Sequence, residues 1–161
     1  MRGAVVGVLM VVSAALTACA GPYQYYGGTG LHDATAAEVA GGWESVEGTR
    51  VVLREDGSAV LESLDGQDFD FEDGWRLSGT GTWRLADRDG GQVVRLALTS
   101  RTRVEQRTSV PVADPSAAEP PSTYSWSFSV DRDQRDELVL FFMYGDPDIG
   151  NMYVMSREPG A

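Results

Sequence analysis

Few side chains in this sequence are suited to covalent or acid–base chemistry. The chain contains one cysteine, Cys19, and one histidine, His32, and its 13 basic residues are all arginine. A single cysteine cannot form an intramolecular disulfide or a Cys-x-x-Cys metal site, and a single histidine cannot form a multi-histidine metal cluster. His32 precedes the main body of the chain, so a Ser-His-Asp arrangement would have to draw its base from a linker. We therefore expect no enzyme activity and no cofactor, with a hydrolase that uses two of the 24 acidic residues as the alternative.

An acidic loop at residues 65–73 is the one stretch that suggests a metal ion. Oxygen-rich loops can bind Ca²⁺, and an EF-hand loop has glycine at position six and a bidentate glutamate at position twelve. Counted from Asp68, the glycine falls at position seven as Gly74, and position twelve is Gly79. We expect no metal site, and calcium binding by this loop remains the alternative.

The N-terminus has the features of a signal peptide. Residues 1–18 contain a positive charge at Arg2, an apolar run over 4–12 and then small residues. The apolar run is shorter than the roughly 20 residues of a transmembrane helix. Leu16-Thr17-Ala18-Cys19 resembles the lipobox of bacterial lipoproteins. The resemblance implies cleavage before Cys19, a diacylglyceryl group on its thiol, and anchoring by lipid to the extracytoplasmic face of the cell membrane. An ordinary signal peptide that ends near a cysteine is the alternative.

The rest of the chain divides into a tether and one domain. Residues 19–32 are rich in glycine and tyrosine without a helical or strand period, which predicts a flexible tether. Residues 33–161 are long enough for one core. Thr35 followed by Glu38 is a capping-box pattern, so we expect a short helix over 36–40.

The body of the chain has an all-β pattern. Short β-branched and aromatic runs alternate with turn-forming Gly, Asp, Asn and Pro clusters. Eight antiparallel strands in sequence order can close into an up-and-down barrel that has no free edges, with a β-sandwich as the alternative. The predicted strands are 41–46, 49–55, 59–64, 79–86, 92–102, 122–130, 137–144 and 151–157.

Aromatic residues are the candidates for a ligand site inside such a barrel. Strand 122–130 alternates aromatic and serine residues, so one of its faces meets the core. Strand 137–144 is apolar on both faces, which suggests that the helix or the tether covers its outer side. Phe69, Phe71 and Trp75 predict either a movable lid or a loop that is packed shut over the barrel. The expected wall residues are Trp83, Trp126, Phe128 and Phe142.

The chain also resembles lipocalin-like proteins. Gly41-Gly42-Trp43 after a short helix matches the Gly-x-Trp opening of lipocalins, and Arg157 on the last strand matches the arginine that crosses this tryptophan. Between them, 79–83 and 145–148 are similar to uncharacterised lipoproteins of high-GC actinobacteria with a lipocalin-like domain. The resemblance implies that Trp43 and Arg157 stack and close the bottom of the barrel.

Charge limits the partners. The formal net charge of −11 repels nucleic acid and anionic lipid surfaces. Two hypotheses remain for a lipid-anchored protein that is not an enzyme. The barrel binds a small apolar or amphiphilic ligand, or its interior is packed and its surface binds an envelope protein, as inhibitors and assembly factors do.

Overall fold

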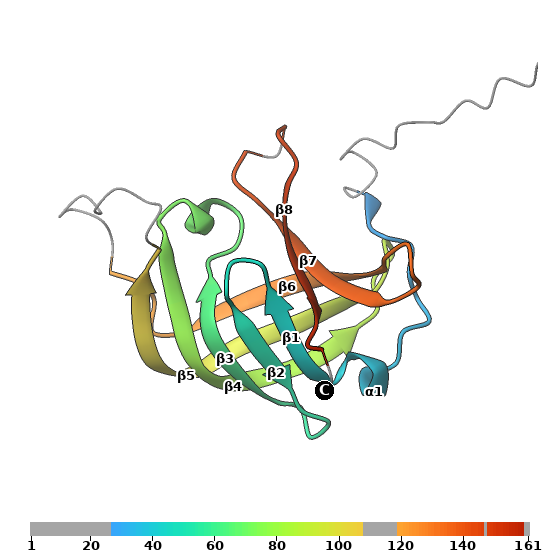
Figure 1. The fold of residues 1–161 in the computed structure, drawn as a ribbon, viewed down its shortest axis with the longest axis horizontal. Coiled ribbons are helices and arrows are strands. Elements are labelled where there is room, and N and C mark those ends of the chain that lie inside the picture. Colours follow the sequence, from blue (N-terminus) through green and yellow to red (C-terminus); the bar gives the residue numbers. More distant parts are fainter. Residues whose placement is uncertain (1–26, 108–118, 147, 160–161) are drawn as a thin grey trace, which may run out of the picture.

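The chain folds into one closed β-barrel. The computed structural model describes residues 27–107, 119–146 and 148–159. The strands pair antiparallel in sequence order, and the last strand returns to the first (Figure 1). The predicted eight-stranded up-and-down, lipocalin-like barrel is therefore confirmed. The strands are β1 (Gly41–Ser45), β2 (Arg50–Leu53), β3 (Ser58–Asp65), β4 (Trp75–Ala86), β5 (Val93–Gln106), β6 (Tyr124–Arg132), β7 (Leu138–Tyr144) and β8 (Asn151–Arg157).

Strands β4 and β5 are longer than the sequence predicted. Trp75 and Leu77 belong to β4 and are buried at 4% and 0% exposure, so the strand starts before position 79. β5 continues to Gln106, paired with Trp75 across the sheet. The two strands form a long hairpin that extends beyond β6, because β6 pairs with β5 only up to Leu98.

The predicted capping box forms at the start of helix α1 (Ala36–Val39). The Thr35 hydroxyl accepts a hydrogen bond from the Glu38 backbone N–H at 3.2 Å, and the Glu38 carboxylate accepts one from the Thr35 N–H at 2.8 Å. These bonds satisfy donors that a helix start leaves free, and they lower the pKa of Glu38. The helix ends at the carbonyl of Val39, which accepts a hydrogen bond from the Trp43 indole at 2.9 Å.

Trp43 and Arg157 close the seam between β1 and β8, as the sequence predicted. The two residues are opposite each other in the ladder, and Arg157 Cζ lies 4.3 Å from the centre of the Trp43 ring. Arg157 Nη1 also donates to the Ala40 carbonyl at 2.7 Å. Trp43 is fully buried, so the guanidinium covers an indole at the base of the core.

The predicted tether is too long at its C-terminal end, because residues 27–32 dock on the barrel. Thr29 Oγ1 donates to the Val130 carbonyl at 2.7 Å, and the Gln92 N–H donates to the Leu31 carbonyl at 2.7 Å. Gly28 lies against the β4–β5 turn, where a Cβ atom would be 1.9 Å from the Gly90 carbonyl oxygen. The glycine at position 28 led to the prediction of a flexible segment, but its missing side chain allows the backbone of the segment to contact the turn closely.

The outer side of β7 is covered at its middle, as expected for a strand that is apolar on both faces. Leu140 and Phe142 belong to the barrel core, and Phe141 between them is only 3% exposed.

Candidate functional site

The predicted wall residues fill the interior of the barrel. Trp83, Trp126, Phe128 and Phe142 are between 1% and 7% exposed. The ring centres of Phe128 and Phe142 are 5.3 Å apart, and Phe142 stacks on Tyr153 at 4.7 Å. The Trp126 indole donates to the Asp65 carbonyl at 2.7 Å, whereas the Trp83 indole donates to Arg54 on the β2–β3 turn. These side chains therefore pack on one another and on the backbone as a core.

The best-defined hollows of the described residues open on the surface. They measure about 230 to 680 Å³. Trp83 and Trp126 contribute to the lining of the smallest, whereas neither Phe128 nor Phe142 lines any of these four. The largest lies beside the β6–β7 turn and is lined by Glu38, Asp133, Arg135, Glu137, Leu138, Ser156, Arg157, Glu158 and Pro159. Its lining is mostly charged, which does not suit an apolar ligand.

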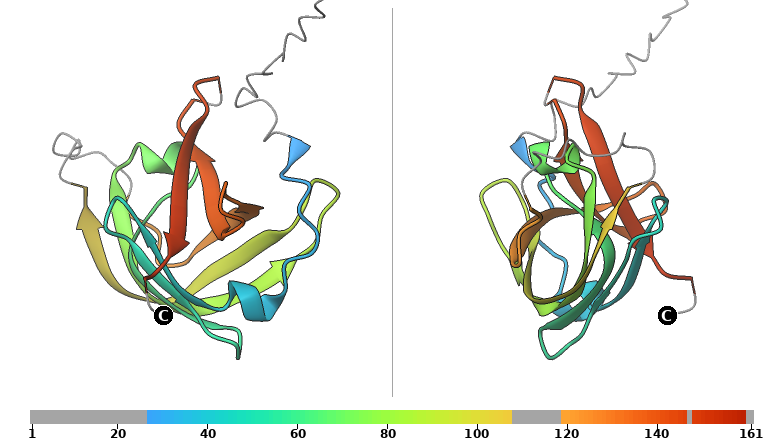
Figure 2. Two further views of the ribbon diagram at one scale, coloured as in Figure 1. Left: turned by 45° about the vertical axis from the view of Figure 1, so that its right-hand side comes forward. Right: turned by 90° about the vertical axis from the view of Figure 1, so that its left-hand side faces the viewer.

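The loop between β3 and β4, residues 66–74, covers the other end of the barrel. We call this end the mouth and the segment the mouth loop (Figure 2). The Gln67 side chain accepts a hydrogen bond from the Ser127 N–H at 2.8 Å, beyond the point where β6 and β7 stop pairing. Asp68 bridges to Tyr144 at the end of β7, and its carbonyl accepts from the Gly145 N–H at 3.2 Å. The mouth loop is thus joined to both strands across the barrel.

Two of the three predicted lid aromatics, Phe71 in the mouth loop and Trp75 at the start of β4, are packed against the barrel. Phe71 lies 3.8 Å from Tyr144 between ring centres, and Arg107 Cζ is 3.6 Å above the Phe71 ring. Trp75 is buried and packs edge-on against Tyr124. Phe69 does not join them, since 65% of it is exposed. The structure therefore has the packed form of the loop.

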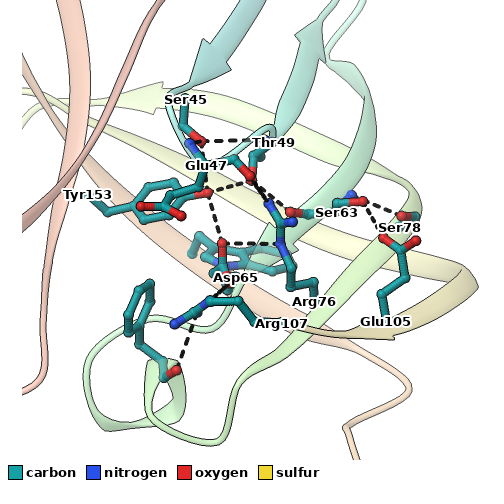
Figure 3. A network of polar contacts seen from close by, with 12 residues as sticks. Ser45, Glu47, Thr49, Ser63, Asp65, Arg76, Ser78, Glu105, Arg107 and Tyr153 are labelled. Atoms are coloured by element: carbon teal, nitrogen blue, oxygen red, sulfur yellow. Dashed lines mark hydrogen bonds and ion pairs between the residues drawn. The ribbon is translucent and has the colours of Figure 1, made fainter. Parts of the chain in front are cut away.

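A buried ion cluster lies directly beneath the mouth loop, centred on Asp65 (Figure 3). Asp65 is fully buried at the end of β3. One carboxylate oxygen accepts from Arg107 Nε at 2.9 Å and from Arg107 Nη2. The other accepts from the Tyr153 hydroxyl at 3.0 Å and lies 3.4 Å from Arg76 Nε. One buried carboxylate thus links β3, β4, β8 and the end of the β5 hairpin.

A chain of hydroxyl groups continues the cluster to the β1–β2 turn. The Tyr153 hydroxyl contacts Ser45 Oγ at 3.1 Å and also Thr49 Oγ1, and Arg76 Nη2 donates to Thr49 at 3.0 Å. Thr49 donates in turn to the Ser63 carbonyl at 2.6 Å. Burial and the nearby Asp65 charge raise the pKa of Tyr153 to about 12, so the phenol is neutral at physiological pH.

Asp65 has a different role from the one its sequence neighbours suggested. It belongs to the acidic run considered for calcium, but both of its oxygens face arginine and tyrosine donors. Within the described part of the chain, no three His, Cys, Asp or Glu side chains are grouped so that they could hold a metal ion. The cluster pairs two arginine cations with one buried anion and links β3, β4 and β8 at the mouth.

Arg76, Arg107 and Tyr153 were not identified from the sequence. Each is a common residue type on a strand or directly after one, and only the barrel register brings them together. The one feature of the sequence that could have pointed to the cluster is Asp65 itself, an acidic residue at the end of a largely apolar strand.

Two remaining sequence candidates lie at the N-terminal side. Cys19 is outside the described residues. His32 Nδ1 is 2.6 Å from Asp87 Oδ1, and both side chains are about half exposed or more.

No helix within the described ranges is long and apolar enough to cross a membrane. Searches against protein-family models, curated proteins and solved structures find no match for this chain.

Proposed function

We propose that this chain is a lipid-anchored protein of the extracytoplasmic membrane face, which acts without catalysis by binding a protein partner through the outside of a packed barrel. The observation that carries the choice is the interior. Eight-stranded barrels either fill with side chains or hold one small ligand. Here four tryptophans, two phenylalanines and Tyr153 are buried inside the barrel or at its mouth.

The closed mouth supports the same choice. A ligand would have to separate Phe71 from Arg107 and Tyr144, and would have to displace a loop that is hydrogen bonded to β6 and β7. It would then meet the Asp65 cluster, whose separation leaves buried charges unpaired. Both ends of the barrel are therefore stabilised by contacts that ligand entry would break.

The lipobox-like sequence supports the anchored location. Residues 19–26 separate the expected lipid on Cys19 from Gly27, the first residue that the structure describes. Eight residues reach about 28 Å at most when fully extended. The side of the barrel near the β4–β5 turn, where Gly28 docks, then stays within that distance of the membrane. A partner would accordingly be a membrane protein or another protein held near the membrane.

An amphiphilic ligand beneath the mouth loop is the second candidate. The specific observation in its favour is the pair Arg76 and Arg107 with Tyr153, since these donors could bind a ligand carboxylate in place of Asp65.

A dansyl-labelled undecanoic acid, titrated into the full chain in zwitterionic micelles, separates the two candidates. Buried tryptophans would transfer excitation energy to a dansyl group that is bound inside. We expect no saturable energy transfer from tryptophan to dansyl beyond the level measured in control micelles that contain an unrelated lipoprotein. Saturable binding at one probe per chain, displaced by oleate, would contradict the packed-barrel proposal and support the second candidate.

A further inference from the structure

Two arginines face each other on the outside of the barrel. Arg84 of β4 and Arg95 of β5 are directly opposite in the antiparallel ladder. Their neighbours Trp83 and Leu96 are buried in the core, so the alternation of the strands directs both arginines outward. Like charges in directly opposite positions destabilise a sheet.

Neither arginine has a partner among the described residues. The other strand arginines have an ion pair with a carboxylate, or in the case of Arg157 a tryptophan ring. Arg84 and Arg95 have no carboxylate within 4.0 Å in the described part of the chain, although the sequence has 24 acidic residues against 13 arginines. In so acidic a chain, two adjacent unpaired cations are an unusual local arrangement.

Small side chains surround the pair and leave it accessible. The strand registers place small or medium-sized outward neighbours on both sides of the pair across β4, β5 and β6, namely Thr82, Ala97, Ser125, Ser127, Ala86, Val93 and Ser129. A shallow hollow of about 230 Å³ lies over these strands, lined in part by Thr82, Arg84, Arg95, Ala97 and Ser125. We call these residues together with Ser127 the arginine face. Trp83, Leu96 and Trp126 also line this hollow, so the face offers guanidinium donors beside a partly apolar depression.

We infer that the arginine face binds an acidic segment of the protein partner. The inference deepens the proposed function, on which it rests, by naming the surface and the chemistry of the partner. Arginine binds carboxylates through two parallel N–H···O bonds, and opposite positions in a ladder place the two arginines about 5 Å apart at Cβ. Two acidic residues one turn apart on a helix have about the same spacing, 5 to 6 Å.

A protein carboxylate is favoured over an anionic lipid surface. The net charge of −11 opposes approach to an anionic membrane, whereas a local contact with one acidic helix is governed by the nearby arginines. Turns next to the face also contain acids, including Asp56 and Asp89, which would disfavour an extended anionic plane.

The test uses a synthetic helical peptide with glutamates at positions i and i+4, added to the ¹⁵N-labelled full chain in zwitterionic micelles. We expect chemical-shift changes centred on the arginine face, which weaken as salt is raised from 50 to 300 mM. The double variant R84E/R95E should bind the peptide roughly tenfold more weakly or not at all. R88E/R135E changes the net charge equally at turn arginines and should bind like wild type.

Three outcomes would overturn the inference. Equal loss in the two double variants would show only a general charge effect. Shift changes centred elsewhere would assign the peptide to another surface. Binding of the wild type to phosphatidylglycerol vesicles but not to the peptide, lost in R84E/R95E alone, would assign the face to lipid. Failure of the proposed function appears separately, as saturable dansyl binding in the interior.

Discussion

Replacing Asp65 by asparagine removes one charge from the centre of the mouth cluster and keeps the shape of the side chain. The change leaves Arg76 and Arg107 without their shared carboxylate, and their side chains are only 16% and 12% exposed. The asparagine Oδ1 can still accept hydrogen bonds, but the NH₂ group that replaces the other carboxylate oxygen is a donor and opposes the donors on that side. We therefore expect a large loss of stability with no change in the fold class.

The size of the loss follows from burial. Removing one partner of a buried ion pair costs about 3 to 5 kcal/mol, because an uncompensated charge remains in the interior. Typical domains have only about 5 to 15 kcal/mol of total stability. With a urea slope of about 2 kcal/mol per molar, the unfolding midpoint should fall by about 2 M.

Urea unfolding followed by tryptophan fluorescence measures this prediction. Asp73→Asn is the matched control, since Asp73 is an exposed residue of the same mouth loop and is expected to change stability by less than about 0.5 kcal/mol. If Asp65→Asn costs less than about 1 kcal/mol, or no more than the control, the cluster does not hold the mouth and the reasoning fails.

Three further predictions concern the two termini and the cluster. In detergent phase separation, the Cys19→Ser variant should no longer partition with the membrane proteins as the wild type does. Equal partitioning of the variant and the wild type would refute lipidation. Arg157→Ala should cost about 1 to 3 kcal/mol in urea unfolding because it uncovers the Trp43 ring, against less than about 0.5 for Arg88→Ala, and equal costs would refute the stacking contribution. The raised pKa of Tyr153 means that the neutral phenol stabilises the fold fully below pH 10 and loses this effect as the pH rises toward about 12. Burial and the hydrogen bond to Asp70 also raise the pKa of Tyr124, so absorbance at 295 nm should show two tyrosines fewer ionising near pH 10 than in the unfolded chain. The Tyr153→Phe titration should lack the step near pH 12 and keep the later step of Tyr124.

Local patterns were enough to predict the barrel. The capping box joins Thr35 and Glu38, which are three positions apart in the sequence. The alternation of aromatic and serine residues in strand β6 is likewise visible in consecutive residues. The contact between Trp43 and Arg157 is distant in sequence, but closure of a barrel requires its first and last strands to be neighbours.

The mouth could not be predicted in the same way. The register between β3 and β4 shifts after Leu61, and Ser63 adopts a positive φ of 51°. Positions 63 to 65 are then all buried, against the two-residue alternation of an ordinary strand. Asp65 thereby enters the interior beside arginines from β4 and from the end of the β5 hairpin, an arrangement that depends on three strand registers at once. Similarly, the glycines at 27 and 28 indicate flexibility locally, and only the position of the β4–β5 turn shows that they dock.

Xenon binding tests the packed interior most directly, because xenon enters dry apolar cavities too small for a lipid. The measurement is the ¹²⁹Xe chemical shift, together with the methyl shifts of core residues, in the full chain under xenon pressure. Phe128→Ala, which removes a fully buried ring, supplies the positive control. The packed barrel predicts no saturable xenon site in the wild type and one in Phe128→Ala. Saturable xenon binding inside the wild-type barrel, with shift changes around Phe128 and Phe142, would contradict it.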